Sequence, residues 1–240
     1  MQFLKVIIKH MIISIHQPNY IPWIGYFEKI FLSDIFIFFD NVQMPKNKSF
    51  VSRSKLVNQN NAFWLTIPIK KEGLKTIAEA EIVNNFWKKK HLSTIHHAYS
   101  KSSFYNNNFN KFSKILLSSD TGYIAELNIK IINLLLEILD IKAKVFRASE
   151  LNLKTSGASS IYEIIKIFGA DTYLSGDGIG SLKHMDYQKL EKLNINLKFV
   201  NTDLKNYYSQ YKNGDNIFSI LDLLLTHGDS YIKEKLNYLI

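Results

Sequence analysis

The sequence predicts an α/β fold in three layers, with helices on both faces of a mostly parallel sheet. Three observations point to it. A strand–helix–strand pattern opens the chain over residues 11–39. Alternating strands and helices return after residue 143. Between them, helical periodicity runs through residues 85–140, which predicts a helical insertion.

The opening unit consists of a buried strand over residues 11–15, a helix over 23–32 and a second strand over 34–39. Apolar side chains at helical spacing predict the helix; they are Trp23, Tyr26, Phe27 and Ile30. Two strands of one sheet that are joined through a helix run parallel. This unit is therefore expected to start a parallel sheet.

The middle of the chain begins with a polar, basic loop over residues 41–53. Residues 63–69 predict a strand, and residues 76–83, where apolar and acidic residues alternate, predict an exposed strand. Periodicity predicts the remaining elements. These are helices over 85–100, 109–117 and 122–139, a strand over 144–148, a helix over 159–168 ended by Gly169, a strand over 172–174, a helix over 187–193, a strand over 196–200, a helix over 218–226 that stops at Gly228, and a short C-terminal helix.

The composition indicates a globular protein, and a length of 240 residues fits one large domain or two small ones. We expect a single α/β domain over residues 11–240. The absence of cysteine excludes disulfides, thiolate metal sites and a cysteine nucleophile, and fits a reducing compartment. The apolar N-terminus is interrupted too early for a signal peptide, and later apolar runs are too short to span a bilayer. We therefore expect a cytoplasmic protein with no transmembrane segment. Because Met11 opens a good strand, residues 1–10 are interpreted as an N-terminal extension or a mis-assigned start.

Positive charge is concentrated in one part of the chain. Residues 41–101 contain eleven Lys and Arg against three acids, close to the whole net charge of +9. Such a block attracts RNA, a nucleotide sugar or an anionic membrane surface; the alternative is a lysine-rich composition that happens to cluster. Arg53, one of only two arginines, lies in this block. Its planar fork suits a carboxylate or a phosphate.

Three polar clusters follow predicted strands, at residues 16–20, 40–43 and 175–178. In an open α/β sheet, ligands bind at the carboxyl ends of the strands. If the sheet is parallel, all three clusters face one crevice.

The first cluster offers His16 as general base, proton donor or hydrogen-bond partner. Gln17 and Asn19 supply both donors and acceptors, and two prolines stiffen the loop. The structural alternative is that these side chains merely satisfy a buried turn. Turns, however, are usually made from Gly, Asn or Ser.

The second cluster offers Asp40 as a base, an orienter of His16 or a metal ligand. Lys46, Lys48 and Arg53 follow it as candidate phosphate ligands, unless the segment is only a loop. In the third cluster, Ser175 and Gly176 open a glycine-rich turn whose backbone N–H groups suit an anion. This turn has neither the Walker nor the dinucleotide pattern.

His91 lies on the apolar face of a predicted helix, so it is either a core histidine or a ligand-binding residue. His96 and His97 are adjacent and point apart, which makes a poor metal pair. Neither HExxH nor GxSxG occurs, so the sequence does not favour a metalloprotease or a serine hydrolase.

Several segments together resemble the WbqC-like family of bacteria. The first is MIISIHQPNYIPWIGYFEKI, followed by a strand ending in D-x-V-Q, a basic loop ending in S-R, and W-L-T-I-P. Later segments agree: residues 87–91 with Tyr99, residues 173–176, and residues 219–222 with Gly228. The resemblance runs from Met11 to about Gly228. It departs from the family at Met44, where many members have an aromatic residue, and at Asp177, which follows the Ser-Gly pair.

The resemblance implies a role beside O-antigen and other surface-polysaccharide genes, where a glycine (aminoacyl) transferase acting on an amino sugar has been suggested. We therefore expect an enzyme that forms an amide on a nucleotide-linked amino sugar. His16 would deprotonate the sugar amine and Asp40 would orient His16. The candidate substrate-binding residues are Gln17, Asn19, Tyr20, Trp23, Gln43, Lys46, Lys48, Arg53, His91, Ser175 and Gly176.

The donor is left open between an aminoacyl-tRNA, which would explain the basic block, and a free amino acid with ATP, for which no motif is present. No cofactor or bound metal is evident, and the oligomeric state is open. The order of the first elements is also similar to the nucleotidylyltransferase-like, Rossmann-like fold, but Gly25-Tyr26 replaces its Gly-His signature. Two alternatives therefore remain: a nucleotidyltransferase-like enzyme acting on a sugar phosphate, and a non-catalytic module that binds a nucleotide sugar or RNA.

Overall fold

The computed structural model describes residues 10–58, 61–71, 73–176, 178, 186–208 and 217–240, with the side chains of residues 205 and 206 excepted. The predicted extension over residues 1–10 therefore lies outside the described residues except for His10. Asp177 and most of the predicted glycine-rich turn also lie outside them.

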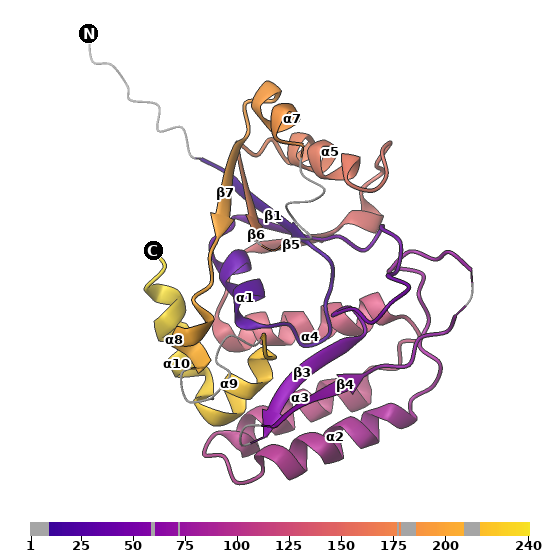
Figure 1. The fold of residues 1–240 in the computed structure, drawn as a ribbon, viewed down its shortest axis with the longest axis vertical. Helices are drawn as coiled ribbons and strands as arrows, with labels where there is room; N and C mark the ends of the chain where they lie inside the picture. Colours follow the sequence, from indigo (N-terminus) through magenta and orange to yellow (C-terminus); the bar gives the residue numbers. More distant parts are fainter. Residues whose placement is uncertain (1–9, 59–60, 72, 177, 179–185, 209–216) are drawn as a thin grey trace.

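A five-stranded parallel sheet forms the centre of the fold, in the order β5-β2-β1-β6-β7 (Figure 1). The chain starts in the middle strand β1, adds β2 and β5 on one side of it, and then adds β6 and β7 on the other side. The direction of building therefore reverses between β1 and β6, where doubly wound sheets bind ligands. The strands are β1 (Ile12–His16), β2 (Ile35–Phe38), β5 (Lys144–Arg147), β6 (Thr172–Gly176) and β7 (Asn196–Val200).

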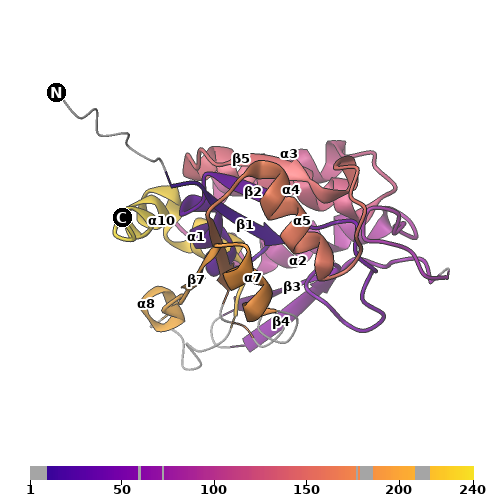
Figure 2. The same cartoon turned by 90° about the horizontal axis from the view of Figure 1, so that it is seen from above.

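Helices cover both faces of this sheet, which confirms the predicted three-layer α/β fold. Helices α1 (Ile24–Phe31) and α4 (Ile124–Leu139) lie on one face, and α5 (Ser159–Phe168) and α7 (Tyr187–Lys192) on the other (Figures 1 and 2). Strand β2 shows why both faces are needed, because all four of its residues are buried. Its phenylalanines pack toward α1 and α4 and its isoleucines toward α5 and α7.

A second apolar layer lies beyond α1 and α4. It combines the antiparallel hairpin of β3 (Arg53–Asn58) and β4 (Asn61–Thr66) with the helices α2 (Phe86–Tyr99) and α3 (Tyr105–Ser118). The C-terminal helices α9 (Ile220–Thr226) and α10 (Gly228–Asn237) pack into the same core, as Figure 1 shows. The helical insertion is therefore completed by the far end of the chain.

Three short elements were not expected from the sequence: strand β3, the 3₁₀ turn η1 (Ala148–Glu150) and helix α8 (Leu204–Tyr208). In β3, Leu56 is buried while the basic residues Arg53 and Lys55 are half-buried. Because its sequence, RSKLVN, begins with basic and polar residues like those of the preceding loop, the pattern did not predict a strand here.

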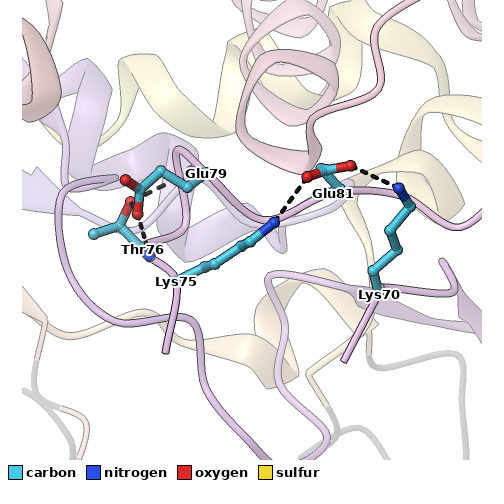
Figure 3. Close-up of polar contacts among 5 residues, drawn as sticks. All are labelled: Lys70, Lys75, Thr76, Glu79 and Glu81. Atoms are coloured by element: carbon cyan, nitrogen blue, oxygen red, sulfur yellow. Dashed lines mark hydrogen bonds and ion pairs between the residues drawn. The ribbon is translucent and has the colours of Figure 1, made fainter. Parts of the chain in front are cut away.

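The predicted strand over residues 76–83 is wrong. In the described chain these residues form a turn with isolated bridges only. The Glu79 carboxylate accepts hydrogen bonds from the Thr76 N–H at 2.9 Å and the Thr76 hydroxyl at 2.8 Å. Glu81 pairs with Lys70 at 2.7 Å and Lys75 at 2.8 Å (Figure 3). The acidic residues therefore cap a turn and bind lysines, which produced the alternation that resembled a strand.

Candidate functional site

The loop after β1, residues 17–22 (the β1 loop), is attached to the segment that leads into the hairpin. The Tyr20 N–H donates to the Phe50 carbonyl at 2.8 Å. The Ser54 hydroxyl donates to the Ile21 carbonyl at 2.9 Å. Two segments that are about thirty residues apart in the sequence thus form one wall beside the end of β1.

The side chain of Asn128 in α4 holds the same two segments together by hydrogen bonds. Its buried amide nitrogen donates to the Pro18 carbonyl at 2.9 Å and to the Val51 carbonyl at 2.8 Å. Sequence reasoning missed this residue. The available signal was a single asparagine on the otherwise apolar face of an amphipathic helix, where a buried polar group needs a partner.

The backbone of the β1 loop is strained at Ile21, which has a φ of 42°. A β-branched residue is a genuine outlier at positive φ, and the following Pro22 restricts it further. The strain is held by tertiary contacts, including a 2.8 Å bond from the Ile220 N–H to the Pro22 carbonyl. Such strain occurs preferentially at ligand-binding sites.

His16 is the last residue of β1, and only one of its two ring nitrogens forms a hydrogen bond to the described protein. Nδ1 lies 3.1 Å from the Gln17 carbonyl, which can only accept, so Nδ1 carries the proton and Nε2 presents a lone pair. The ring packs edge-on against Trp23 and Tyr26, at centroid distances of 5.6 and 4.9 Å. Burial, and then the charge of Lys29, lower the pKa of His16 from 6.5 to about 3. The imidazole is therefore neutral near pH 7.

Lys29 lies directly behind this strand end, where sequence reasoning did not place a functional residue. Its side chain is 3% exposed and its Nζ donates to the Ile15 carbonyl at 3.1 Å. Among the described residues it has no carboxylate partner. Burial lowers the pKa of Lys29 to about 7. The site thus contains an amine that changes its charge near neutral pH.

Asp40 does not orient His16 in this structure, contrary to expectation. Its fully buried carboxylate accepts from Arg147 Nε at 2.9 Å, the Ser149 N–H at 2.9 Å and the Ser149 hydroxyl at 2.8 Å. Both of its oxygens are used, and the His16 ring bonds to the Gln17 carbonyl instead. The reason is the strand order: β2 lies between β1 and β5, and Asp40 bonds to Arg147 at the end of β5 and to Ser149 in the following turn η1.

The amides of Gln17 and Asn19 make no hydrogen bond to any described residue, although Asn19 is only 3% exposed. Tyr20 and His91, by contrast, are partners inside the core, with the Tyr20 hydroxyl 3.0 Å from His91 Nδ1. Burial lowers the pKa of His91 to about 4, so it is a neutral residue beside the ring of Trp87. The geometry favours the core interpretation of His91.

Ser175 and Gly176 end β6 next to β1, in a register that pairs Ile13 with Tyr173. Ser175 is buried, and its hydroxyl donates to the Gly176 carbonyl at 3.2 Å. The first and third predicted clusters therefore start from adjacent strand ends, on the two sides of the switch point.

The basic loop after Asp40 faces the solvent. Gln43, Lys46 and Lys48 are exposed. Gln43 and Lys46, together with Met44, Pro45 and Leu74, line a shallow surface groove.

Arg53 is half-buried, with its guanidinium carbon 4.0 Å from the centre of the Trp64 ring. Of the predicted phosphate ligands, it is the one held in a defined position by packing.

Buried polar atoms without a hydrogen-bond partner gather around this region. Buried polar atoms are normally satisfied, so each exception needs a reason. Those in the basic loop, or on side chains that contact the β1 loop, are Asn41 Oδ1, Ser49 Oγ, Arg53 Nε, Trp87 Nε1 and Asn128 Oδ1.

No group of three His, Asp or Glu side chains among the described residues could hold a metal ion. No helix in the described part of the chain is long and apolar enough to cross a membrane.

Comparison with known proteins identifies the family of the chain. The model of the WbqC-like protein family matches residues 17–234, from the start of the β1 loop into α10. The chain belongs to the WbqC-like protein family. The resemblance inferred from the sequence is thereby confirmed.

This WbqC-like chain is also similar to an uncharacterized protein of Mycobacterium tuberculosis. The two are 26% identical over 219 residues, which cover 90% of this chain and 94% of the mycobacterial protein. No solved structure matches the chain.

Proposed function

We propose that this WbqC-like protein is an aminoacyl transferase that joins a glycine-type donor to the amino group of a nucleotide-linked sugar, in O-antigen or other surface-polysaccharide synthesis. One observation carries the proposal: a neutral His16 with an unpaired Nε2 at the switch point of a doubly wound sheet. A proton acceptor at that position suits an amine nucleophile.

In the proposed step, the sugar amine attacks the carbonyl carbon of the aminoacyl ester and a C–N bond forms. The attacking nitrogen becomes an ammonium and gives one proton to His16 Nε2. The C–O bond to the donor then breaks, and the leaving oxygen takes the proton from His16. Because burial lowers the pKa of His16 to about 3, the imidazole is unprotonated at neutral pH and is a weak base, and the imidazolium that it forms returns the proton readily to the leaving oxygen.

The unpaired amides of Gln17 and Asn19 support this assignment. Each offers two N–H donors and a carbonyl acceptor beside His16 in the sequence, and neither is used by the described protein. In the proposal they bind the sugar and stabilise the oxyanion that develops on the attacked carbonyl. Asn19 suits the second task because its amide is already largely desolvated.

The donor is proposed to be an aminoacyl-tRNA. Residues 41–101 carry most of the net positive charge, and Lys46 and Lys48 are exposed on the loop that follows Asp40. Basic, exposed side chains bind the phosphates of RNA without sequence preference. A free amino acid activated by ATP is the competing donor.

Mass spectrometry of the product tests the proposal. The protein is incubated with nucleotide-linked 4-amino sugars, glycine, ATP and glycyl-tRNA, and each component is omitted in turn. A mass gain of one glycyl residue on the sugar that requires only glycyl-tRNA is the expected result.

Two other outcomes would contradict the proposal. Release of nucleotide from ATP or CTP in the presence of a sugar phosphate would indicate nucleotidyl transfer. Tight binding of the nucleotide sugar with no product under any combination would indicate a binding module.

A further inference from the structure

A row of aromatic rings runs from His16 to the outer face of the hairpin. The ring centroids of His16 and Trp23 are 5.6 Å apart, those of Trp23 and Phe50 are 5.5 Å apart, and those of Phe50 and Trp64 are 5.8 Å apart. The row joins the end of β1, the start of α1, the basic loop and strand β4. It therefore crosses segments that only the fold brings together.

The hairpin register explains why the row ends at the surface. Lys55 pairs with Trp64 and Arg53 pairs with Thr66, so these four side chains share one face. Leu56 and Leu65 point the other way into the core and are almost fully buried. Trp64 is nevertheless 41% exposed, which is unusual for a tryptophan in the middle of a strand.

Arg53 lies over that exposed ring with its hydrogen-bonding capacity unused. Its guanidinium carbon is 4.0 Å from the ring centre, and its buried Nε has no hydrogen-bond partner among the described residues. It forms no ion pair with any described residue. Stacking holds the guanidinium plane in one orientation, so little further ordering is needed to grip a phosphate.

We propose that Phe50, Trp64 and Arg53 form a nucleotide subsite, in which a nucleobase stacks on the aromatic rings and the adjoining phosphate binds Arg53. Every base has a π-face that stacks on aromatic side chains, and the arginine fork matches phosphate oxygens. The inference deepens the proposed function: the aromatic row then leads from the nucleotide to the reacting group at His16.

The same chemistry could come from the nucleoside diphosphate of the sugar substrate or from the unpaired 3′ end of an RNA donor. The shared ligand is a base with a neighbouring phosphate. Titrations with UDP, dTDP and ADP represent the first source, and titration with the trinucleotide CCA represents the second. Pyrophosphate, which has no base, is the control ligand.

Isothermal titration calorimetry on the full chain tests the subsite without any need for turnover. Trp64→Ala is expected to weaken nucleoside diphosphate binding about tenfold or more, and Trp64→Phe to restore most of the affinity because a ring remains. Arg53→Lys keeps the charge but loses the fork, and is expected to weaken binding about tenfold. Phe86→Ala removes a ring that is 85% exposed on α2 and should leave affinity unchanged.

Circular dichroism of each variant separates lost binding from lost folding. Binding of either nucleotide source that depends on Trp64 and Arg53 supports the subsite, and the tighter source identifies the ligand. The subsite is overturned if pyrophosphate binds as tightly as the nucleoside diphosphates, or if Trp64→Ala behaves like Phe86→Ala.

The experiments distinguish a failure of the proposed transferase function from a failure of the nucleotide subsite. Nucleotide binding through Trp64 without glycyl transfer would leave the subsite standing and remove the transferase. Transfer with an unchanged KM in Trp64→Ala would remove only the subsite.

Discussion

At the scale of single residues, the two nitrogens of His16 have separate tasks. Nδ1 holds the ring by its bond to the Gln17 carbonyl, and Nε2 presents a lone pair. Asparagine has an amide N–H that can replace the first task, but it has no basic nitrogen for the second. Replacing His16 by asparagine therefore keeps the hydrogen bond that positions the side chain and removes the nitrogen that accepts a proton.

His16→Asn is expected to lower the transfer rate by about 100- to 10,000-fold, the usual contribution of a general base. Affinity for the nucleotide sugar should stay within about threefold of the wild-type value, since this variant keeps the amide donor. Product formation measured by mass spectrometry, together with calorimetric titration, checks both. His97→Asn, at an exposed position on α2, is the matched control. A His16→Asn rate within tenfold of wild type would remove His16 from the proposed chemistry.

Lys29 predicts a pH dependence of folding stability. Burial lowers its pKa from 10.5 to about 7, so between these values the unfolded chain binds more protons than the folded protein. Stability therefore rises with pH in this window and falls as pH drops toward 7. The change is about 1.4 kcal/mol per pH unit where the difference is one whole proton.

Lys29→Met removes this titration. The unfolding free energy of wild type minus that of Lys29→Met is expected to rise by about 1.4 kcal/mol per pH unit between about pH 7.5 and 9.5. Urea denaturation at a series of pH values measures it. Lys71→Met, at an exposed position, should follow wild type throughout. A difference that stays flat with pH would show that Lys29 is not desolvated as described.

At the scale of elements, α1 is attached to the segment after β7 by a close approach at Gly25. A Cβ on Gly25 would overlap Thr202 Oγ1 and lie 3.0 Å from Trp23 Nε1. Next to it, Glu28 is 2% exposed and accepts hydrogen bonds from the hydroxyls of Thr202 and Tyr207, the latter at 2.7 Å. Burial raises the pKa of Glu28. A single glycine therefore permits the contact that brings β7 against α1.

Gly25→Ala should destabilise the protein by about 1–3 kcal/mol, the usual cost of overpacking, even though alanine is the better helix former. Chemical denaturation measures the change. Gly122→Ala is the matched control, because a Cβ there has nothing within 4 Å and should change stability by less than about 0.5 kcal/mol. Equal effects of the two substitutions would contradict the close approach.

Elements with strong periodicity were predicted well because their pattern reflects burial directly. Strand β7 has the predicted bounds, and α5 ends as predicted at Gly169, which has a φ of 63°. The errors have a different origin. The turn at Thr76 is stabilised by side-chain capping, and β3 carries its basic residues on the same face as Trp64. At Thr76 a local side-chain cap, and in β3 the pairing with β4, override the pattern of apolar and polar residues.

At the scale of the whole molecule, the Tyr99 hydroxyl links three distant segments. It donates to Asp222 Oδ1 of α9 at 2.8 Å and accepts from the Val57 N–H of β3 at 3.2 Å. Tyr99 itself ends α2, and its partner Asp222 is fully buried. One hydroxyl thus connects the hairpin, the helical insertion and the C-terminal helices.

Tyr99→Phe is expected to lower the unfolding free energy by about 1–3 kcal/mol, because the ring still fits while buried partners lose a hydrogen bond. Urea denaturation measures this cost. Tyr123→Phe, at a ring that is 43% exposed, should be close to neutral. Unchanged stability in Tyr99→Phe would show that the hydroxyl does not join the segments.

The candidate site was predictable where it follows strand ends. His16, Gln17, Asn19, Ser175 and Gly176 could be assigned to one edge because parallel strands share their carboxyl ends. Lys29 and Asn128 were not assigned to it, because they come from helices, and strand order does not specify which residues the buried face of a helix contacts. Asp40 was assigned the wrong partner, because its neighbour depends on which strand lies beyond β2.

The sequence by itself determined the α/β class, most of the strands and helices, the polar β1 loop and membership of the WbqC-like family. These properties follow from hydrophobic periodicity and local motifs, which are short-range. Only the tertiary structure decided that Asp40 binds Arg147 and that Asn128 fastens the β1 loop. It alone placed Phe50 and Trp64 in line with His16, through Trp23. These contacts join residues far apart in the chain, and their partners are chosen by packing that no local pattern encodes.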